Sequence, residues 1–245
     1  MKTMQNIRYG SFPEEELDLY LPEGGAHTLF LYFHGGGLEG GSKEGLGRMA
    51  ERFTEAGIAL ASANYRMYPT AQFPDYLEDS ADAAHWAETE GKKLSGAARL
   101  FIGGSSAGGY ISMMLFADAR FLEKRGMDAM AVDGYVFDAG QPTTHFNILK
   151  YDRGADPRLV RLDEAAPLYF IDHDYPKDAS LPRLQIFCAE RDMVNRLEQN
   201  RLLMRTLLHF GYPEENLRFD YMEGFGHCGY TGNDDFCTRV IGFIG

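Results

Sequence analysis

Short apolar runs without regular alternation recur along this chain of 245 residues, and segments with helical periodicity separate them. Near the amino terminus, residues 5–9 and 16–21 flank a turn at Pro13, which favours an antiparallel pair of strands at the edge of a sheet. The later runs lack alternation, which is typical of strands covered on both faces. They occupy residues 28–33, 58–63, 99–102, 132–137, 184–188 and 217–221.

Helical patterns fill most of the intervals between these runs. The predicted helices cover residues 46–55, 76–90, 107–120, 197–210 and 234 to the carboxyl terminus. This alternation of strand and helix predicts one α/β domain over residues 1–245, with a mostly parallel, doubly wound sheet and helices on both faces. In such a sheet, ligands bind beyond the carboxyl ends of the strands.

One segment, at about residues 140–181, interrupts this rhythm. It contains four prolines and no long amphipathic period. A long excursion at the carboxyl edge of a sheet often shapes a substrate pocket. The pattern fits a small lid and a partly helical crossover equally well, so both interpretations stay open.

The composition limits the classes of function. The formal net charge of −12 disfavours binding to nucleic acid or to an anionic membrane surface. No apolar run approaches the roughly 18 residues of a membrane helix, so membrane insertion is not expected. The amino terminus lacks the apolar stretch of a secretory signal, which favours a cytoplasmic location. Three cysteines without metal-ligand spacing indicate neither a disulfide framework nor a zinc site; they are Cys188, Cys228 and Cys237.

The pentapeptide Gly104-Ser-Ser106-Ala-Gly108 matches G-x-S-x-G and lies between a predicted strand and a predicted helix. This context indicates a nucleophile elbow, a sharp strand-to-helix turn in which flanking glycines avoid collisions with neighbouring backbone. Ser106 is therefore the candidate nucleophile. The chemistry also requires a base, a carboxylate that orients the base, and N–H donors for an oxyanion.

His227 is the candidate base. The elbow resembles that of the α/β-hydrolase arrangement, in which the acid and then the base follow the serine in chain order. Of the seven histidines, His227 alone stands in a glycine-rich loop directly after the last predicted strand. The acid is expected after the preceding strand, where Asp192 lies furthest into the loop. Glu190 is the second choice and Asp138 the third.

The sequence His34-Gly35-Gly36-Gly37 follows the strand that ends at residue 33. Glycines let backbone N–H groups point into a cleft, which is what stabilising a tetrahedral oxyanion requires. We expect Gly36, Gly37 and Ala107 to supply these N–H groups. A glycine-rich surface turn is the alternative for this loop, and His34 is expected to order the loop rather than to act as a base.

These motifs together resemble the α/β-hydrolase fold, and more narrowly the HGGG-containing group of esterases and lipases related to hormone-sensitive lipase. The resemblance spans roughly residues 28–230. It includes a stretch similar to that group's Y-R-x-x-P…F-P…D…W pattern, in which Tyr65, Arg66 and Trp86 are interpreted as scaffold.

The chain departs from that group at several positions. Ser105 stands where aspartate commonly precedes the nucleophile, Leu38 replaces an often bulky residue after the glycines, and a long amino-terminal extension is lacking. The resemblance therefore implies a compact carboxylesterase, similar to bacterial enzymes that act on acetylated or feruloylated sugars.

The resulting hypothesis is a serine carboxylic-ester hydrolase that works through an acyl-enzyme on short-chain acyl or acylated-sugar esters. It needs no metal or organic cofactor, and the sequence does not predict its oligomeric state. One alternative is an amide hydrolase similar to arylformamidases, although Gly37 and Leu38 stand where that family has an aromatic residue and tryptophan. The other is a ligand-binding protein on a hydrolase fold.

Overall fold

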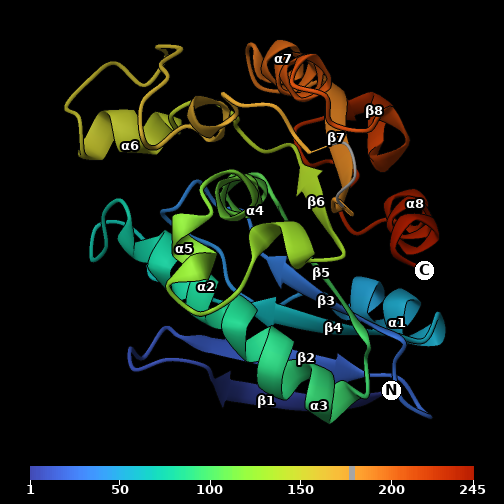
Figure 1. The fold of residues 1–245 in the computed structure, drawn as a ribbon. Coiled ribbons are helices and arrows are strands. Elements are labelled where there is room, and N and C mark those ends of the chain that lie inside the picture. Colours follow the sequence, from blue (N-terminus) through green and yellow to red (C-terminus); the bar gives the residue numbers. More distant parts are fainter. Residues whose placement is uncertain (177–179) are drawn as a thin grey trace.

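The computed structural model describes residues 1–176 and 180–245, in which the strands form one eight-stranded sheet in the order β1-β2-β4-β3-β5-β6-β7-β8 (Figure 1). The long apolar runs occupy its centre because a strand between two helical layers buries side chains on both faces. The strands are β1 Lys2–Arg8, β2 Glu16–Leu21, β3 Thr28–Phe33, β4 Ile58–Ala63, β5 Arg99–Ser105, β6 Gly134–Asp138, β7 Arg183–Arg191 and β8 Leu217–Gly226.

The pairing of the strands confirms the predicted α/β-hydrolase fold class. Strand β1 pairs antiparallel with β2, and β2 pairs antiparallel with β4, which forms the expected antiparallel edge. All other neighbours, from β4 through β3 to β8, are parallel. The carboxyl ends of β3, β5, β6, β7 and β8 therefore lie along one edge of the sheet, and the candidate residues follow these ends.

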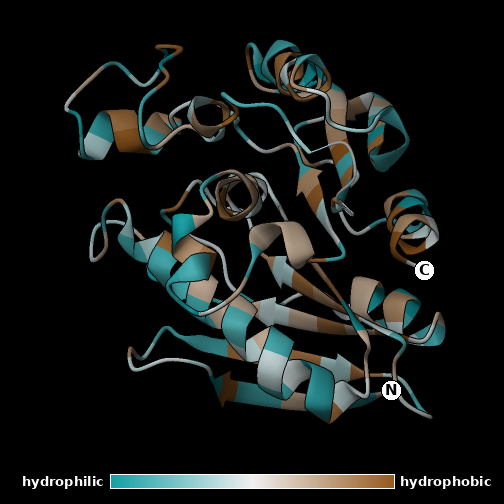
Figure 2. Cartoon of the chain, in the orientation of Figure 1, coloured by the Kyte–Doolittle hydropathy of each residue, from teal (hydrophilic) through white to brown (hydrophobic). Residues whose placement is uncertain are grey.

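Helices cover both faces of the sheet, and each face has its own buried cluster. One cluster joins the sheet to α1 and α8, which contact each other, and the other joins it to α2, α4 and α7 (Figure 1). In Figure 2 brown and teal residues mix along α1 and α8, as expected of helices with one buried face. The α-helices are α1 Gly47–Glu55, α2 Asp75–Trp86, α3 Lys92–Ser95, α4 Ala107–Ala117, α5 Arg120–Glu123, α6 Phe146–Tyr151, α7 Arg196–His209 and α8 Asp234–Ile244.

Two predicted helices differ from the structure: one extends further and contains a π-helical turn, and the other is shorter. The pattern over 76–90 becomes α2, a π-helical turn at Ala87–Gly91 and then α3. The pattern over 107–120 ends at Ala117, and Asp118 then pairs with Arg120 at 2.7 Å. Among residues 1–176 and 180–245, every helix is too short or too polar to span a lipid bilayer.

The irregular segment 140–181 contains α6 and a short 3-10 turn at Pro167–Phe170. Residues 177–179 of this segment lie outside the described residues. The start of this segment is buried, as the 0% exposure of Thr143 and Thr144 shows. The segment therefore combines a packed crossover with the exposed stretch 157–162, of which residues 157–160 line a cavity next to the candidate site described below.

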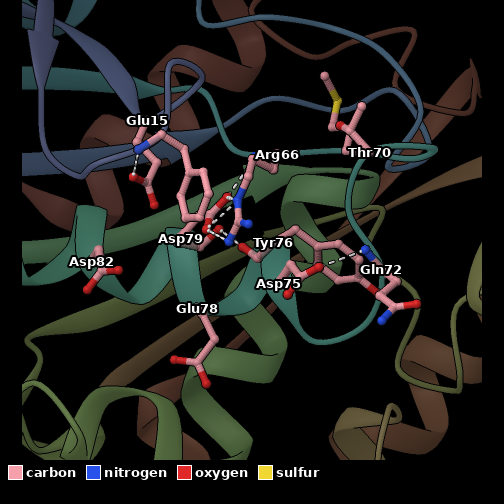
Figure 3. A network of polar contacts seen from close by, with 12 residues as sticks. Glu15, Arg66, Thr70, Gln72, Asp75, Tyr76, Glu78, Asp79 and Asp82 are labelled. Carbon is pink, nitrogen blue, oxygen red and sulfur yellow. Dashed lines mark hydrogen bonds and ion pairs between the residues drawn. The ribbon is translucent and has the colours of Figure 1, made fainter.

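Arg66 and Asp79 form the polar contact that fixes the segment after β4, as the scaffold interpretation of Arg66 expects (Figure 3). The guanidinium makes a paired contact with the Asp79 carboxylate, at 2.6 Å for the shortest N–O distance, and Arg66 N donates to the same carboxylate at 2.9 Å. Asp79 is 1% exposed, so this planar ion pair is well desolvated. Phe12 covers the guanidinium at 3.7 Å from its ring centre.

Candidate active site

Ser106 occupies a sharp turn between β5 and α4. Its backbone is in a rare region, with φ 54° and ψ −111°, which costs on the order of 1–3 kcal/mol and persists only where the surroundings enforce it. Here Ser106 N donates to the carbonyl oxygen of Asp138 at 2.7 Å, which anchors the turn to the end of β6. The strained turn presents the hydroxyl beyond the sheet edge, as expected of a nucleophile elbow.

Gly104 and Gly108 flank the serine because no side chain fits at either position. A Cβ atom on Gly108 would overlap the backbone of Phe33 and His34, and one on Gly104 would overlap Phe33 and Gly108. These contacts are with backbone atoms at the end of β3, which cannot rotate away. The glycines of the motif thus allow β3, β5 and α4 to approach one another closely.

A Gly108→Ala substitution is expected to destabilise the fold by about 3 kcal/mol or more, because the added methyl group meets backbone rather than a flexible side chain. Urea denaturation measures the change in the free energy of unfolding. Gly242→Ala is the control, because a Cβ there meets nothing within 4 Å. Gly126→Ala is unsuitable, because Gly126 has a positive φ of 72°. Equal stability of the Gly108 and Gly242 variants would contradict this packing argument.

The structure brings Ser106, His227 and Asp192 together, as the sequence predicts. His227 Nε2 lies 2.8 Å from Ser106 Oγ, and His227 Nδ1 lies 2.6 Å from Asp192 Oδ1. The three residues come from the β5–α4 turn, the loop after β8 and the loop after β7. The two hydrogen bonds form a continuous path from a hydroxyl through an imidazole to a carboxylate, which is the geometry that activates a serine.

Asp192 is held as an ionised carboxylate. Its side chain is 1% exposed and accepts hydrogen bonds from Met193 N at 2.7 Å and Ala189 N at 3.3 Å. Burial raises the pKa of this carboxyl, but the hydrogen bond and charge of His227 and the backbone donors outweigh burial, so the net shift is downward. An ionised Asp192 fixes the imidazole tautomer with hydrogen on Nδ1, which leaves Nε2 free to accept a proton.

The two other carboxylates that the sequence offered as the acid do not contact His227. Glu190 is exposed at the end of β7, where it accepts a hydrogen bond from Gly224 N at 2.8 Å. Asp138 is fully buried and accepts hydrogen bonds from Ser105, Tyr230 and Thr231 instead. The geometry therefore selects Asp192 from the three candidates.

A thiol also lies near the imidazole. Cys228 Sγ is 3.7 Å from His227 Nε2, against 2.8 Å for Ser106 Oγ. Burial raises the pKa of the Cys228 thiol, so a reactive thiolate is disfavoured. The closer hydroxyl at the strained turn remains the candidate nucleophile.

The glycine loop after β3 lies against the elbow. A Cβ atom on Gly35 would be 3.2 Å from Ser106 Cβ, while Gly36 and Gly37 adopt positive φ values of 119° and 66°. Ala107 is the first residue of α4, whose leading N–H groups have no partner within the helix. Gly36 and Gly37 line the same cleft as Ser106, and Ala107 directly follows Ser106 at the start of α4; their part as donors to an oxyanion stays a prediction.

Two residues outside the glycines hold this loop. Tyr65 OH donates to the carbonyl oxygen of His34 at 2.8 Å, and its ring stacks on the His34 imidazole at 4.5 Å. His34 Nδ1 lies 2.7 Å from the carbonyl oxygen of Gly35, and burial lowers the pKa of its imidazole. These contacts agree with the prediction that His34 orders the glycine loop and does not act as the base. Asn147 Nδ2 donates to the carbonyl oxygen of Gly37 at 2.6 Å.

Comparison with known proteins agrees with this geometry. The family model described as alpha/beta hydrolase fold matches residues 30–227 of this chain, which is most of its length. The chain belongs to this alpha/beta hydrolase family. Within it, the chain is similar to the hormone-sensitive-lipase-like group of esterases and carboxylesterases.

The chain is also similar to individual esterases and carboxylesterases. The versiconal hemiacetal acetate esterase of Aspergillus parasiticus is 27% identical over 223 residues, covering 84% of this chain and 68% of the relative. The carboxylesterase NlhH of Mycobacterium tuberculosis is 29% identical over 149 residues, covering 60% of this chain and 41% of the relative. The chain spans only 28% to 32% of the length of three other curated relatives.

Among solved structures, a truncated carbohydrate esterase from gut microbiota superposes with a TM-score of 0.76 at 18% identity. The superposition covers 100% of this chain and 95% of that chain. At this identity the likeness shows the fold. No group of three or more His, Cys, Asp or Glu side chains suited to a metal ion occurs within residues 1–176 and 180–245.

Two neighbouring cavities of this hydrolase lie at the carboxyl edge of its sheet within the described residues. The catalytic cleft, of about 440 Å³, includes Ser106 and His227 among its lining residues. A neighbouring cavity of about 490 Å³ is lined mainly by apolar side chains, including Leu159, Val160 and Val194. Phe146 and Met193 line both cavities and so form the wall that they share.

Sequence reasoning missed several residues of this site. Phe146 and Asn147 lie in the irregular segment, where no periodicity predicted their positions, and Met193 follows the acid without a recognisable motif. Tyr230 and Thr231 follow the base by three and four residues, and no motif in the sequence identifies them as part of the site. Only the approach of segments distant in sequence reveals these contacts.

Proposed function

We propose that this protein is a serine carboxylic-ester hydrolase. The observation that carries the proposal is the continuous hydrogen-bonded path from Ser106 through His227 to Asp192, with distances of 2.8 Å and 2.6 Å. This path opens on a cleft that also contains the glycine loop. The family's esterase members support the same reaction.

Each side chain has a defined part in the reaction. Ser106 Oγ attacks the ester carbonyl carbon while His227 Nε2 takes the hydroxyl proton. The carbonyl oxygen becomes an oxyanion that accepts hydrogen bonds from the N–H groups of Gly36, Gly37 and Ala107, and each such donor is worth on the order of 10²- to 10³-fold in rate.

The tetrahedral intermediate then collapses as His227 returns the proton to the departing alkoxide, which leaves as the alcohol. The acyl group stays bound to Ser106 Oγ. A water molecule gives its proton to His227 and attacks this acyl group. The second intermediate releases the carboxylic acid and restores the Ser106 hydroxyl. Asp192 stays ionised throughout and stabilises the imidazolium that forms in each half of the reaction.

For the substrate we propose esters with short acyl groups, including acylated sugars. Phe146 and Met193 line both the catalytic cleft and the apolar cavity, and we take them as a wall that favours acyl groups ending there. An open cleft at the sheet edge leaves room for a bulky polar alcohol such as a sugar. A carbohydrate esterase among the structural neighbours supports this choice.

A hydrolysis panel tests the proposed function. Purified protein should hydrolyse 4-nitrophenyl acetate and butyrate with a higher kcat/KM than the octanoate, and release acetate from acetylated sugars. N-formylkynurenine, the amide substrate that the alternative hypothesis requires, should turn over more slowly than these esters. No turnover of any ester by folded protein would contradict the proposal, and faster turnover of the amide would reassign the enzyme to amide hydrolysis.

The shared wall gives a sharper prediction. In a Phe146→Ala variant the two cavities join, and the octanoate-to-acetate ratio of kcat/KM should rise by about 10-fold, since burial of added methylenes in an apolar pocket is worth on the order of 1–3 kcal/mol. Leu202→Ala is the matched control, because Leu202 is 53% exposed on α7 and lines neither cavity. An unchanged ratio in the Phe146 variant would show that the wall does not limit acyl length.

A further inference from the structure

Asp138 is a carboxylate buried directly beneath the catalytic residues. It lies at the end of β6, has 0% exposure and pairs in register with Ser105 of β5, the neighbour of the nucleophile. Within residues 1–176 and 180–245 it forms no ion pair with Lys, Arg or His. A buried carboxylate without a cation is costly unless hydrogen bonds satisfy it, so its partners define its purpose.

Three hydroxyl groups donate to this carboxylate. Ser105 Oγ and Thr231 Oγ1 both donate to Oδ2 at 2.5 Å, and Tyr230 OH donates to Oδ1 at 2.6 Å. Tyr32 OH in turn donates to Ser105 Oγ at 2.9 Å. The cluster thus joins β3, β5, β6 and the loop after β8; three of its hydroxyls donate to Asp138, and that of Tyr32 donates to Ser105.

The cluster holds both reacting partners. The backbone carbonyl of Asp138 accepts the hydrogen bond of Ser106 N at 2.7 Å, while its carboxylate holds Tyr230 and Thr231 in the loop that carries His227. That loop begins after Gly226 and turns through Cys228, which has a positive φ of 54°. A loop bent in this way needs an anchor on its far side to keep the imidazole over the serine.

We propose that Asp138 is a positioning residue of the ester hydrolysis, which fixes the Ser106 turn through its backbone and the His227 loop through its carboxylate. This inference rests on the proposed function, because it concerns the same reaction. It assigns to Asp138 a place beside the catalytic acid rather than instead of it.

The charge of Asp138 agrees with this arrangement. Burial raises the pKa of its carboxyl; the hydroxyl donors and the nearby His227 oppose that rise, and the net shift is upward. Two acceptor oxygens that receive three O–H donors suit an ionised carboxylate, which accepts hydrogen bonds only. An asparagine of the same shape has one acceptor oxygen and an NH₂ group that faces a donor hydroxyl.

In an Asp138→Asn variant, kcat for 4-nitrophenyl acetate should fall by on the order of 10²-fold, because a displacement of about 1 Å between base and nucleophile has this effect on rate. KM should change by less than about 3-fold, because Asp138 itself does not line the cleft and the expected displacement acts mainly on the distance between base and nucleophile. Labelling of Ser106 by a fluorophosphonate probe should slow in parallel with kcat.

Asp220→Asn is the matched control. Asp220 is a carboxylate of β8 with 5% exposure whose partners are Arg218, Arg239 and Gln185, away from the catalytic cleft. The control therefore reports the effect of neutralising a buried acid on stability alone. Thermal unfolding of both variants shows whether each is folded at the assay temperature.

Tyr230→Phe supplies a second route, because it keeps the aromatic ring and removes one donor. Its kcat should fall by about 10-fold in the native background and by much less in the Asp138→Asn background, since the two residues act through one hydrogen bond. Additive effects in this double-mutant cycle would overturn the proposal, and so would a folded Asp138→Asn enzyme with kcat within about 3-fold of the native value. An inactive native protein would instead refute the proposed function.

Discussion

Replacement of Ser106 by alanine is expected to lower kcat for 4-nitrophenyl acetate by on the order of 10⁴-fold or more. The reason is that the attacking oxygen disappears, while the oxyanion donors and the cleft remain and support only slow attack by water. KM should stay close to its native value because the hydroxyl contributes little to binding the ester before attack. Steady-state kinetics of the purified variant measure both constants.

Ser80→Ala is the matched control for this substitution. Ser80 is fully buried on α2, where its hydroxyl donates to the carbonyl oxygen of Tyr76 at 2.7 Å. The control removes a buried serine hydroxyl without touching the cleft, so its kcat should equal that of the native protein. A Ser106→Ala enzyme whose rate stays within about 10-fold of native would contradict the role of Ser106.

Replacement of Asp192 by asparagine is expected to lower kcat by on the order of 10⁴-fold, because the amide favours the wrong imidazole tautomer. Asparagine at this site would donate a hydrogen bond to His227 Nδ1, which moves the ring hydrogen to Nε2 and removes the acceptor that faces Ser106. The fold should persist because asparagine matches the shape of aspartate. Steady-state kinetics give the loss in kcat, and circular dichroism confirms folding.

Glu190→Gln is the control that separates Asp192 from the neighbouring acid at the end of β7. Glu190 lies two residues earlier and is exposed, with a hydrogen bond to Gly224 N at 2.8 Å. Its variant should keep the native kcat. A large loss at Glu190 together with a small loss at Asp192 would exchange the roles that the structure indicates.

The sequence predicted the central strands well because they are covered on both faces. The runs 28–33 and 58–63 coincide with β3 and β4, since a continuous apolar run has few alternatives between two helical layers. Strands β5, β7 and β8 extend further than predicted. Their carboxyl ends contain glycine and polar residues that continue to pair with neighbouring strands at the edge where the site forms.

The candidate site was predictable where chain order and backbone geometry constrain it. Ser106 needs flanking glycines, and His227 follows the last strand, so both positions leave a mark in the sequence. The acid was harder to assign, because Glu190 and Asp192 differ by two positions. The structure separates them: β7 runs to Arg191, which leaves Glu190 exposed on the strand and Asp192 at the start of the loop beneath His227.

The supporting contacts depend on where the loops lie in space. Asp138 was considered only as a third choice for the acid, yet it binds three hydroxyl groups under the site. Ser105 stands where the HGGG-containing esterases and lipases commonly have aspartate, and it is one of those donors. A side chain such as Asn147, which orients the Gly37 carbonyl from α6, leaves no periodic or motif signal.

Ser106, His227 and Asp192 are proposed to act as one unit in which Ser106 Oγ is the nucleophile. Reaction with a fluorophosphonate, followed by intact-mass and peptide mass spectrometry, tests this proposal most directly. We expect one adduct, located on Ser106, whose formation slows by orders of magnitude in a His227→Ala variant. Folded native protein that stays unlabelled, or that carries the adduct on another residue, would refute the assignment of Ser106 as the nucleophile.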